Sequence, residues 1–260
     1  MDILERIFDQ KRQDVAEQKA RIPLKMVKSL VADAPQARGF RAALESSAHR
    51  PALIAEVKKA SPSKGVIRAD FDAVAIAKSY ETAGADCLSV LTDAQFFQGS
   101  PRDLTLCRES TSLPILRKDF TVDEYDVWQA RALGADAVLL IVAGLTASQL
   151  REYRELAQFL GMDAIVEAHD KKQADKALAS GATIVGINNR DLKTFETNIE
   201  NSLKLLSGLA KKAMAISESA IETCEEVEKL GKAGARAVLI GTVLCSATDV
   251  ESKVKEVMGW

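Results

Sequence analysis

The sequence has little excess of charge of either sign. Its 35 Lys and Arg residues nearly balance 37 Asp and Glu residues, which leaves a formal net charge of -2. A protein that binds nucleic acid or an acidic membrane surface through its overall field carries a clear basic excess. We therefore expect neither partner, and any anionic ligand must be held by a local site.

Long apolar runs are also missing. No stretch approaches the roughly 18 apolar residues of a transmembrane helix. The opening MDILERIFDQKRQ carries charges where a signal peptide needs an apolar core. These absences predict a cytoplasmic protein. Hydrophobic residues make up 47% of the sequence, which is typical of a folded globular protein.

Paired cysteines and nucleotide-binding glycine motifs are absent as well. The four cysteines, Cys87, Cys107, Cys224 and Cys245, lie far apart, without the spacing of a zinc site or a redox dithiol. We expect reduced, mostly buried thiols and no metal. The SPSKG stretch from Ser61 lacks the Walker spacing, and no GxGxxG follows an apolar run. Nucleotide binding has little support.

From residue 52 onward, short apolar runs alternate with amphipathic stretches. The runs are rich in the Val, Ile and Leu of strands covered on both faces: ALIAEVK, CLSVLT, PILRKD, AVLLIVA, AIVEAH, TIVGIN, AMAISES and AVLIGT. Intervening segments such as DFDAVAIAKSYETAGA have helical apolar spacing. This alternation predicts eight parallel strands joined by right-handed helical crossovers.

Eight β/α units fit either a closed barrel or a long open sheet. No run carries along its length the charge or proline that protects an exposed edge, so we favour a (β/α)8 TIM barrel. No linker divides the chain, which predicts one domain over residues 1–260. Four similar tetrapeptides, AGAD, LGAD, SGAT and AGAR, each place a glycine between a helix and a strand, where a left-handed residue is expected.

Residues 1–46 precede the first strand and form a predicted N-terminal helical extension. Ile3, Leu4, Ile7, Phe8 and Val15 lie on one side of its first helix. The helix could cap one end of the barrel for stability. Alternatively, it could lie over the open end and contact ligand.

Ionisable and polar residues recur at the predicted C-terminal ends of the strands, where barrel enzymes have their active sites. Side chains alternate faces along a strand, so Glu56 and Lys58 point the same way. Any one of these residues alone would be read as a solvated loop residue. Several buried together must pair with one another or with a ligand, because an uncompensated buried charge costs several kcal/mol. The set is Glu56, Lys58, Ser61, Lys118, Glu167, Asn188, Arg190, Glu218, Ser219, Gly241 and Thr242.

The same end of the predicted barrel has a possible phosphate site and a histidine. The SESA and IGT segments supply small residues and hydroxyls after the seventh and eighth strands, where such barrels often bind phosphate. With the two lysines, they suggest an anionic sugar phosphate. His169 could act as a base, but a hydrogen-bonded structural imidazole is the favoured reading.

Several long segments resemble, in order, the motifs of the indole-3-glycerol-phosphate synthase family of the tryptophan pathway. They are EVKKASPSKG, LSVLTDAQFFQGS, LPILRKDFTVDEYDVWQARALGADAVLLIVA, IVEAHD, GINNRDLKTFETN, SESAIET and VLIGT, within about residues 40–245. The resemblance implies a cytoplasmic carboxy-lyase, a monomer or weak homodimer. It closes the indole ring of 1-(2-carboxyphenylamino)-1-deoxyribulose 5-phosphate, a sugar phosphate with an anthranilate moiety, using no metal or organic cofactor.

The resemblance also implies catalytic roles. Lys118 would be the general acid that protonates the ribulose carbonyl oxygen, and Glu167 would transfer a proton during dehydration. Glu56 and Lys58 would flank the reacting centre, with Lys58 meeting substrate anions or serving as the later acid. A positioned ammonium fits the negative charge that develops on the oxygen.

The remaining matched positions fall into three supporting sets. Substrate and lysines would be oriented by Asn188 and Glu218, with Arg190 at the anthranilate side. Carboxylate or phosphate would be surrounded by Ser61, Ser219, Ala220, Gly241 and Thr242. The aromatic ring would be gripped by Phe97, Phe120 and Leu139.

One of these positions departs from the family pattern. SESAI stands where the family usually has SESGI, so Ala220 replaces a glycine expected to meet phosphate. If the backbone φ is positive there, alanine is strained or the loop is shifted. We expect weaker phosphate binding or a compensating adjustment. Ala168 in VEAHD also departs, but should face outward harmlessly.

Two other kinds of function share this pattern. A Schiff-base aldolase would use a lysine at a strand end to attack a sugar-phosphate carbonyl. A catalytically silent ligand-binding barrel would not need the Lys118 and Glu167 pair. Trapping with borohydride distinguishes the first alternative, and an indole fluorescence assay distinguishes the second.

Overall fold

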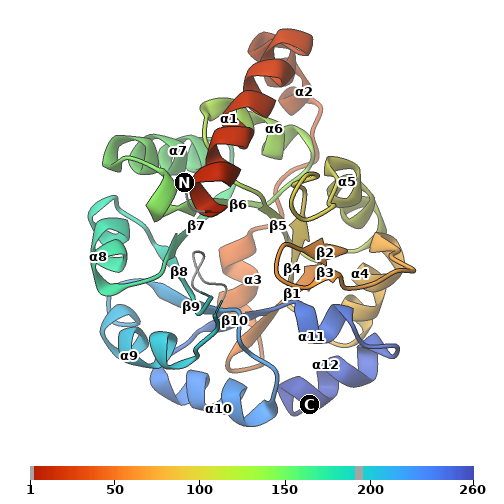
Figure 1. The fold of residues 1–260 in the computed structure, drawn as a ribbon, viewed down its shortest axis with the longest axis vertical. Coiled ribbons are helices and arrows are strands. Elements are labelled where there is room, and N and C mark those ends of the chain that lie inside the picture. The colour runs from red at the N-terminus through yellow and green to blue at the C-terminus, as the bar shows by residue number, and fades with distance from the viewer. Residues whose placement is uncertain (1–2, 191–195) are drawn as a thin grey trace.

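Eight parallel strands form a closed barrel in the computed structural model, which describes residues 3–190 and 196–260 (Figure 1). The ring closes where β1 pairs with both β4 and β10. The predicted TIM barrel is therefore confirmed. In chain order the barrel strands are β1 (Ala52–Val57), β4 (Cys87–Leu91), β5 (Ile115–Lys118), β6 (Ala137–Ile141), β7 (Asp163–Ala168), β8 (Ile184–Asn188), β9 (Met214–Glu218) and β10 (Ala237–Ile240).

Helices surround the barrel and connect its strands (Figure 1). Most begin at a Ser, Thr or Asp whose side chain accepts a backbone N–H, as Asp72, Thr146 and Thr223 do. The helices are α4 (Ala73–Thr82), α5 (Pro101–Ser110), α6 (Glu124–Ala132), α7 (Ala147–Phe159), α8 (Lys171–Ala179), α9 (Glu200–Leu209), α10 (Cys224–Ala233), α11 (Thr242–Cys245) and α12 (Val250–Met258). A short hairpin of β2 (Ala60–Ser61) and β3 (Gly65–Val66) follows β1, and a 3-10 turn, η1 (Val142–Gly144), follows β6.

The strands divide their side chains between two cores. Leu53, Ala55 and Val57 of β1 pack in the layer between strands and helices, whereas Ala52 and Ile54 pack inside the barrel. This alternation confirms the predicted parity, because Glu56 falls on the inward face. The four predicted glycine turns are also confirmed, with φ between 84° and 110° at Gly84, Gly134, Gly181 and Gly234.

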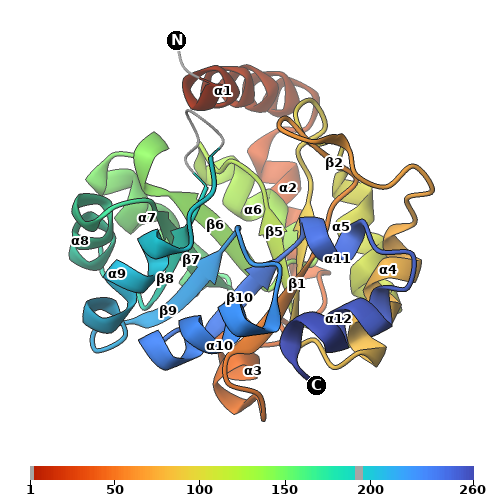
Figure 2. The same ribbon diagram turned by 60° about the horizontal axis from the view of Figure 1, so that its bottom comes forward.

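The N-terminal segment reaches both ends of the barrel. It contains α1 (Ile3–Arg21), α2 (Leu24–Ala32) and α3 (Phe40–Ser46). Figure 2 shows α1 above the barrel and α3 below it. Phe40 and Leu44 of α3 are fully buried in the interior core, at the end where the strands begin. The first helix, α1, therefore lies over the mouth and not in the capping position that was one of its two expected places, and α3 closes the other end.

Three cysteines are buried, Cys224 is partly exposed, and all four are free thiols, as predicted. No helix in the described ranges is long and apolar enough to cross a membrane.

Asp136, at the start of β6, joins three segments at the lower end of the barrel. Its fully buried carboxylate accepts hydrogen bonds from the backbone N–H groups of Arg38 and Ile115, each at 2.7 Å. It also forms an ion pair with Arg108 of α5 at 2.7 Å. The connection into α3, the start of β5 and helix α5 are therefore held by one side chain.

Replacing Asp136 with alanine should destabilise the fold strongly, because Arg108 would remain as an uncompensated buried charge. Loss of one partner of a buried pair typically costs about 3–5 kcal/mol. We expect the midpoint of thermal unfolding to fall by on the order of 10 °C. Asp175→Ala, which removes an exposed pair with Lys171, is the control and should leave the midpoint unchanged. An equal midpoint in the two variants would contradict the role of Asp136.

Candidate active site

A cavity of about 460 Å³ opens at the C-terminal ends of the barrel strands. The structure brings all the residues predicted for the site to the lining of this one cavity. From the charged and polar set these are Glu56, Lys58, Ser61, Lys118, Glu167, Asn188, Arg190, Glu218, Ser219, Ala220, Gly241 and Thr242, and from the apolar set Phe97, Phe120 and Leu139.

Lys118 is at the centre of the charged part of the cavity. Its Nζ lies 2.6 Å from Oε2 of Glu218 and 3.1 Å from Oε2 of Glu167. Lys118 and Glu218 are the last residues of β5 and β9, and Glu167 is the last but one of β7, so segments 49 to 100 residues apart supply one ion cluster. Both carboxylates are buried, and the ammonium keeps one open side toward the cavity.

The three groups shift one another's pKa. Burial alone would lower the pKa of Lys118, but the carboxylates of Glu218, Glu167 and Glu56 together raise it well above its ordinary value. Burial would likewise raise the pKa of Glu167, yet Lys118 and the imidazole of His169 hold it below its usual range. Glu218 behaves in the opposite way. Burial and the charge of Glu167 outweigh Lys118 and raise the pKa of Glu218 to about 7.

His169 accounts for part of this asymmetry between the two carboxylates. Its Nε2 lies 3.6 Å from Oε1 of Glu167. For Oε1 of Glu218, by contrast, no hydrogen-bond partner lies within the described part of the chain. Of the two carboxyl groups, Glu218 therefore takes up a proton at the higher pH. His169 thus contacts the site through Glu167.

Two glycines provide the space that the charged side chains occupy. A Cβ on Gly186 of β8 would collide with Oε1 of Glu218. A Cβ on Gly241 would collide with Oε1 of Glu56 and would lie 2.9 Å from Nζ of Lys58. Glu56 and Lys58 form an ion pair above Gly241. Gly186 was missed in the sequence, although a glycine inside an apolar run is a sign of close approach.

The opposite side of the cavity is apolar. The rings of Phe97 and Phe120 lie 6.1 Å apart between centroids, tilted by 37°. Leu139 of β6 and Ile3, Leu4 and Ile7 of α1 also line the cavity. The first helix of the N-terminal extension therefore covers the open end of the barrel, as the second of the two predictions for it stated.

The turn after β9 has an unusual backbone. Ser219 and Ala220 are both left-handed, with φ of 67° and 60°. Asn189 supports the turn by donating to the carbonyl of Ser219 at 3.1 Å and to the hydroxyl of Ser217 at 2.9 Å. Ala220 was expected either to be strained at a positive φ or to lie in a shifted loop. The structure shows the first outcome, a strained alanine at a positive φ. The supporting Asn189 was not foreseen.

Arg190 connects the loop after β8 to the β2–β3 hairpin. Its Nη1 donates to the hydroxyl of Ser63 at 3.3 Å, and its backbone N–H donates to the side-chain oxygen of Asn188 at 3.0 Å. Ser61 belongs to the same hairpin. Residues 191–195 of the GINNRDLKTFETN motif lie outside the described residues.

The arrangement combines a buried proton donor, two carboxylates and an aromatic wall in one cavity. Among the described residues, no group of His, Cys, Asp and Glu is arranged to hold a metal ion. The chain matches the family model described as indole-3-glycerol phosphate synthase over residues 4–257. The chain belongs to this family. The family's activity, that of a carboxy-lyase in tryptophan biosynthesis acting on a small-molecule phosphate, is therefore the activity of this chain.

Individual members of the indole-3-glycerol phosphate synthase family are close in sequence. The chain is 46% identical to the protein of that name from Neisseria meningitidis serogroup B over 256 residues, covering 97% of this chain and 98% of that one. It is 47% identical to that from Chloroherpeton thalassium over 249 residues, covering 95% and 96%.

Solved structures of more distant proteins share the fold. A tryptophan synthase alpha-subunit from Pyrococcus furiosus superposes with a TM-score of 0.63 at 16% identity, covering 82% of this chain and 99% of that one. Thiamine phosphate pyrophosphorylase from the same organism gives a TM-score of 0.58 at 15% identity, covering 80% and 94%. At this identity the likeness establishes the barrel and no more.

Replacing Ala220 with glycine should stabilise the protein. A left-handed alanine costs roughly 1–2 kcal/mol, part of which is offset because glycine makes the unfolded chain more flexible. We expect the free energy of unfolding in urea to rise by about 0.5–1 kcal/mol. Ala69→Gly, at an exposed turn without a positive φ, is the matched control and should lower it. A loss of stability in Ala220→Gly would show that the turn is not strained.

The raised pKa of Glu218 predicts a pH-dependent cost in stability. The folded state holds this proton up to about pH 7, whereas an unfolded glutamate loses it near its usual pKa of about 4.3. Between these values the folded state binds more protons, so wild-type stability falls as pH rises. Glu218→Gln stays neutral and avoids this loss.

We therefore expect Glu218→Gln to have wild-type stability near pH 4.5 and to exceed it above pH 7 by on the order of 1–3 kcal/mol. Urea unfolding of both proteins across this range measures the difference. If the difference in free energy of unfolding between the two proteins does not change with pH, the pKa of Glu218 is not raised.

Proposed function

We propose that this cavity closes the indole ring of 1-(2-carboxyphenylamino)-1-deoxyribulose 5-phosphate, with Lys118 as the acid that starts the reaction. The observation that carries the proposal is the ammonium of Lys118, 2.6 Å and 3.1 Å from two buried carboxylates and open to the cavity. The carboxylates keep it protonated despite its burial. A charged donor facing an otherwise enclosed site suits an oxygen on which negative charge develops.

The first step forms the new carbon–carbon bond. The ring carbon that bears the carboxylate attacks the ribulose carbonyl carbon, and the carbonyl oxygen takes a proton from Lys118. Loss of carbon dioxide leaves its bonding electrons in the six-membered ring and restores that ring's aromaticity. The apolar wall of Phe97, Phe120 and Leu139 would bind the aromatic ring in both the substrate and the transition state.

Dehydration completes the five-membered ring. The hydroxyl leaves as water after taking a proton from a lysine, Lys58 or the reprotonated Lys118. Glu167, whose pKa is held low by Lys118 and His169, accepts the proton lost from the carbon beside the nitrogen. Glu56 pairs with Lys58 and would fix its ammonium beside the reacting centre. Proton transfers of this kind typically contribute about 10²–10⁴-fold each.

Binding groups surround this centre. Glu218 would orient Lys118, and Asn188 would orient the sugar. Arg190, anchored to the β2–β3 hairpin, would meet the anthranilate carboxylate together with Ser61. The phosphate would be held at the other rim by Ser219, Ala220, Gly241 and Thr242. Neither a metal nor an organic cofactor enters the proposed reaction.

The setting of the enzyme is also proposed. We assign it to the cytoplasm as one domain over residues 1–260, with residues 1–46 as its N-terminal extension. We propose a monomer or weak homodimer as its state of association. Sedimentation at several protein concentrations measures the state of association.

Lys118→Ala should lower kcat by about 10³-fold or more while leaving substrate affinity largely unchanged, because the acid acts mainly in the transition state. Indole fluorescence of the product measures turnover. Lys172→Ala, at an exposed position of α8, is the control and should be fully active. Turnover near wild type in Lys118→Ala would show that the assigned acid is wrong, and a borohydride-trapped adduct would instead support Schiff-base chemistry.

A further inference from the structure

Lys11 occupies a position in α1 where an apolar residue is expected. The buried residues of this helix are Ile7, Phe8, Lys11 and Val15, which lie on one face at helical spacing. Lys11 is only 5% exposed. A lysine is rarely buried without a partner, so its charge must be compensated at the barrel.

The partner is Asp119, the residue between Lys118 and Phe120. Nζ of Lys11 lies 2.6 Å from Oδ1 of Asp119, with both side chains no more than 6% exposed. The same Oδ1 accepts the backbone N–H of Phe120 at 2.8 Å. The other oxygen, Oδ2, accepts from Thr92 at 2.6 Å and from Arg117 at 3.0 Å. Asp119 therefore ties α1 to the end of β5 at the point where the proposed acid and one aromatic residue emerge.

A second buried carboxylate faces the same charge. Asp93 is 4% exposed, and its Oδ1 accepts the backbone N–H groups of Phe96 at 2.7 Å and Phe97 at 3.2 Å. Burial raises the pKa of Asp93, Asp119 raises it further, and Lys11 lowers it. The hydrogen bonds of Asp93 thus shape the loop that carries Phe97.

Phe8 places the helix against the same aromatic residues. Its ring meets that of Phe120 edge-on, with centroids 5.7 Å apart. It also fits over Gly144 of η1 so closely that a Cβ there would collide with it. Lys11, one helical turn away, therefore fixes a helix already in contact with the aromatic wall.

We propose that Lys11 is a positioning residue for the ring-closing reaction, which through Asp119 holds Phe120, and with it the facing ring of Phe97, at the spacing that the aromatic ring of the substrate needs. The inference rests on the proposed function, because that function places the ring between these residues. Lys11 itself does not line the cavity, so it acts only through the groups that it holds.

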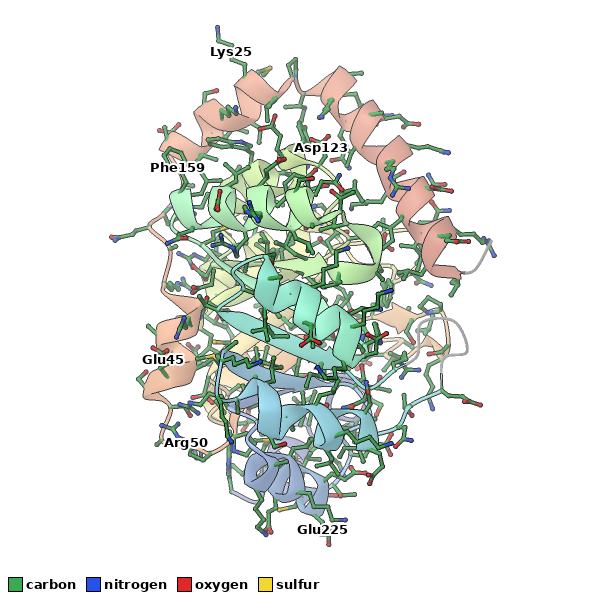
Figure 3. The ribbon with its side chains drawn as sticks, turned by 90° about the vertical axis from the view of Figure 1, so that its left-hand side faces the viewer. Lys25, Glu45, Arg50, Asp123, Phe159 and Glu225 are labelled. Atoms are coloured by element: carbon green, nitrogen blue, oxygen red, sulfur yellow. The ribbon has the colours of Figure 1, made fainter. Side chains whose placement is uncertain are left out.

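Another ion pair of α1 provides a matched control. Lys19 pairs with Asp123 at 2.7 Å, but these side chains are 39% and 32% exposed. Figure 3 shows Asp123 below the junction of α1 and α2. Loss of this pair weakens the attachment of the helix without disturbing Asp119 or Asp93.

The test is the steady-state kinetics of Lys11→Met, with Lys11→Gln as a second variant that keeps a hydrogen-bond donor if the first does not fold. We expect KM to rise about tenfold and kcat to change by less than about threefold, since the aromatic wall binds substrate and transition state alike. Lys19→Met should keep wild-type values. In Lys11→Met combined with Asp119→Asn, KM should rise by less than the product of the two single effects, because the residues are directly coupled.

Three results would overturn the inference. A fall in unfolding temperature with KM unchanged in the Lys11 variants would make the role structural only. If KM rises equally in Lys19→Met, the effect comes from the attachment of the helix in general. If the effects of Lys11→Met and Asp119→Asn on KM multiply in the double variant, Lys11 does not act through Asp119. Absence of indole formation by the wild type would instead reject the proposed function, and the positioning role with it.

Discussion

The sharing of one ammonium by two buried carboxylates is the interaction around which this molecule is organised. Lys118, Glu167 and Glu218 come from three strands and meet only because the barrel closes. Three ionisable groups in so small a volume cannot all be charged independently. One carboxylate is held ionised with His169 beside it, and the other keeps a proton near neutral pH. The cluster therefore contains a donor and an acceptor at once, as acid–base chemistry at one centre requires.

The cluster also requires that side chains be absent at neighbouring positions of the barrel. Gly186 and Gly241 leave space where most strand residues would fill the interior, and the charges of Glu218 and Glu56 enter it. Ser219 and Ala220 hold a strained backbone in the same rim. Stability is provided elsewhere, by the two hydrophobic cores and by polar junctions such as Asp136 at the opposite end. The charged cluster and the strained turn thus lie at the C-terminal ends of the strands, and the Asp136 junction supports the opposite end.

Much of this arrangement could be predicted from the sequence. Alternating apolar runs and amphipathic segments implied the eight strands, and the two-residue period of a strand placed Glu56 with Ile54 on the inward face. Position at strand ends was enough to bring Lys118, Glu167 and Glu218 to one mouth. The roles of these residues came from family resemblance, because spacing alone does not distinguish an acid from an orienting group.

Other features depend on contacts between distant segments and have no local signal. Lys11 was not singled out in the sequence, since nothing near it in the chain indicates Asp119. Asn189 is one of two adjacent asparagines, and only the fold shows that it supports the turn at Ser219. The role of Gly186 depends on a glutamate from the next strand.

Helices α1 and α3, at opposite ends of the barrel, are synthesised before the strands on which they pack. These helices leave the ribosome before any strand, yet the surfaces that bury them are made by strands that follow. Phe8 and Phe40 must therefore stay in contact with solvent or chaperones until much of the chain has been translated. The first segment to be synthesised is thus buried only after residues far along the chain have followed it, as the contacts of Phe8 with Phe120 and Gly144 require.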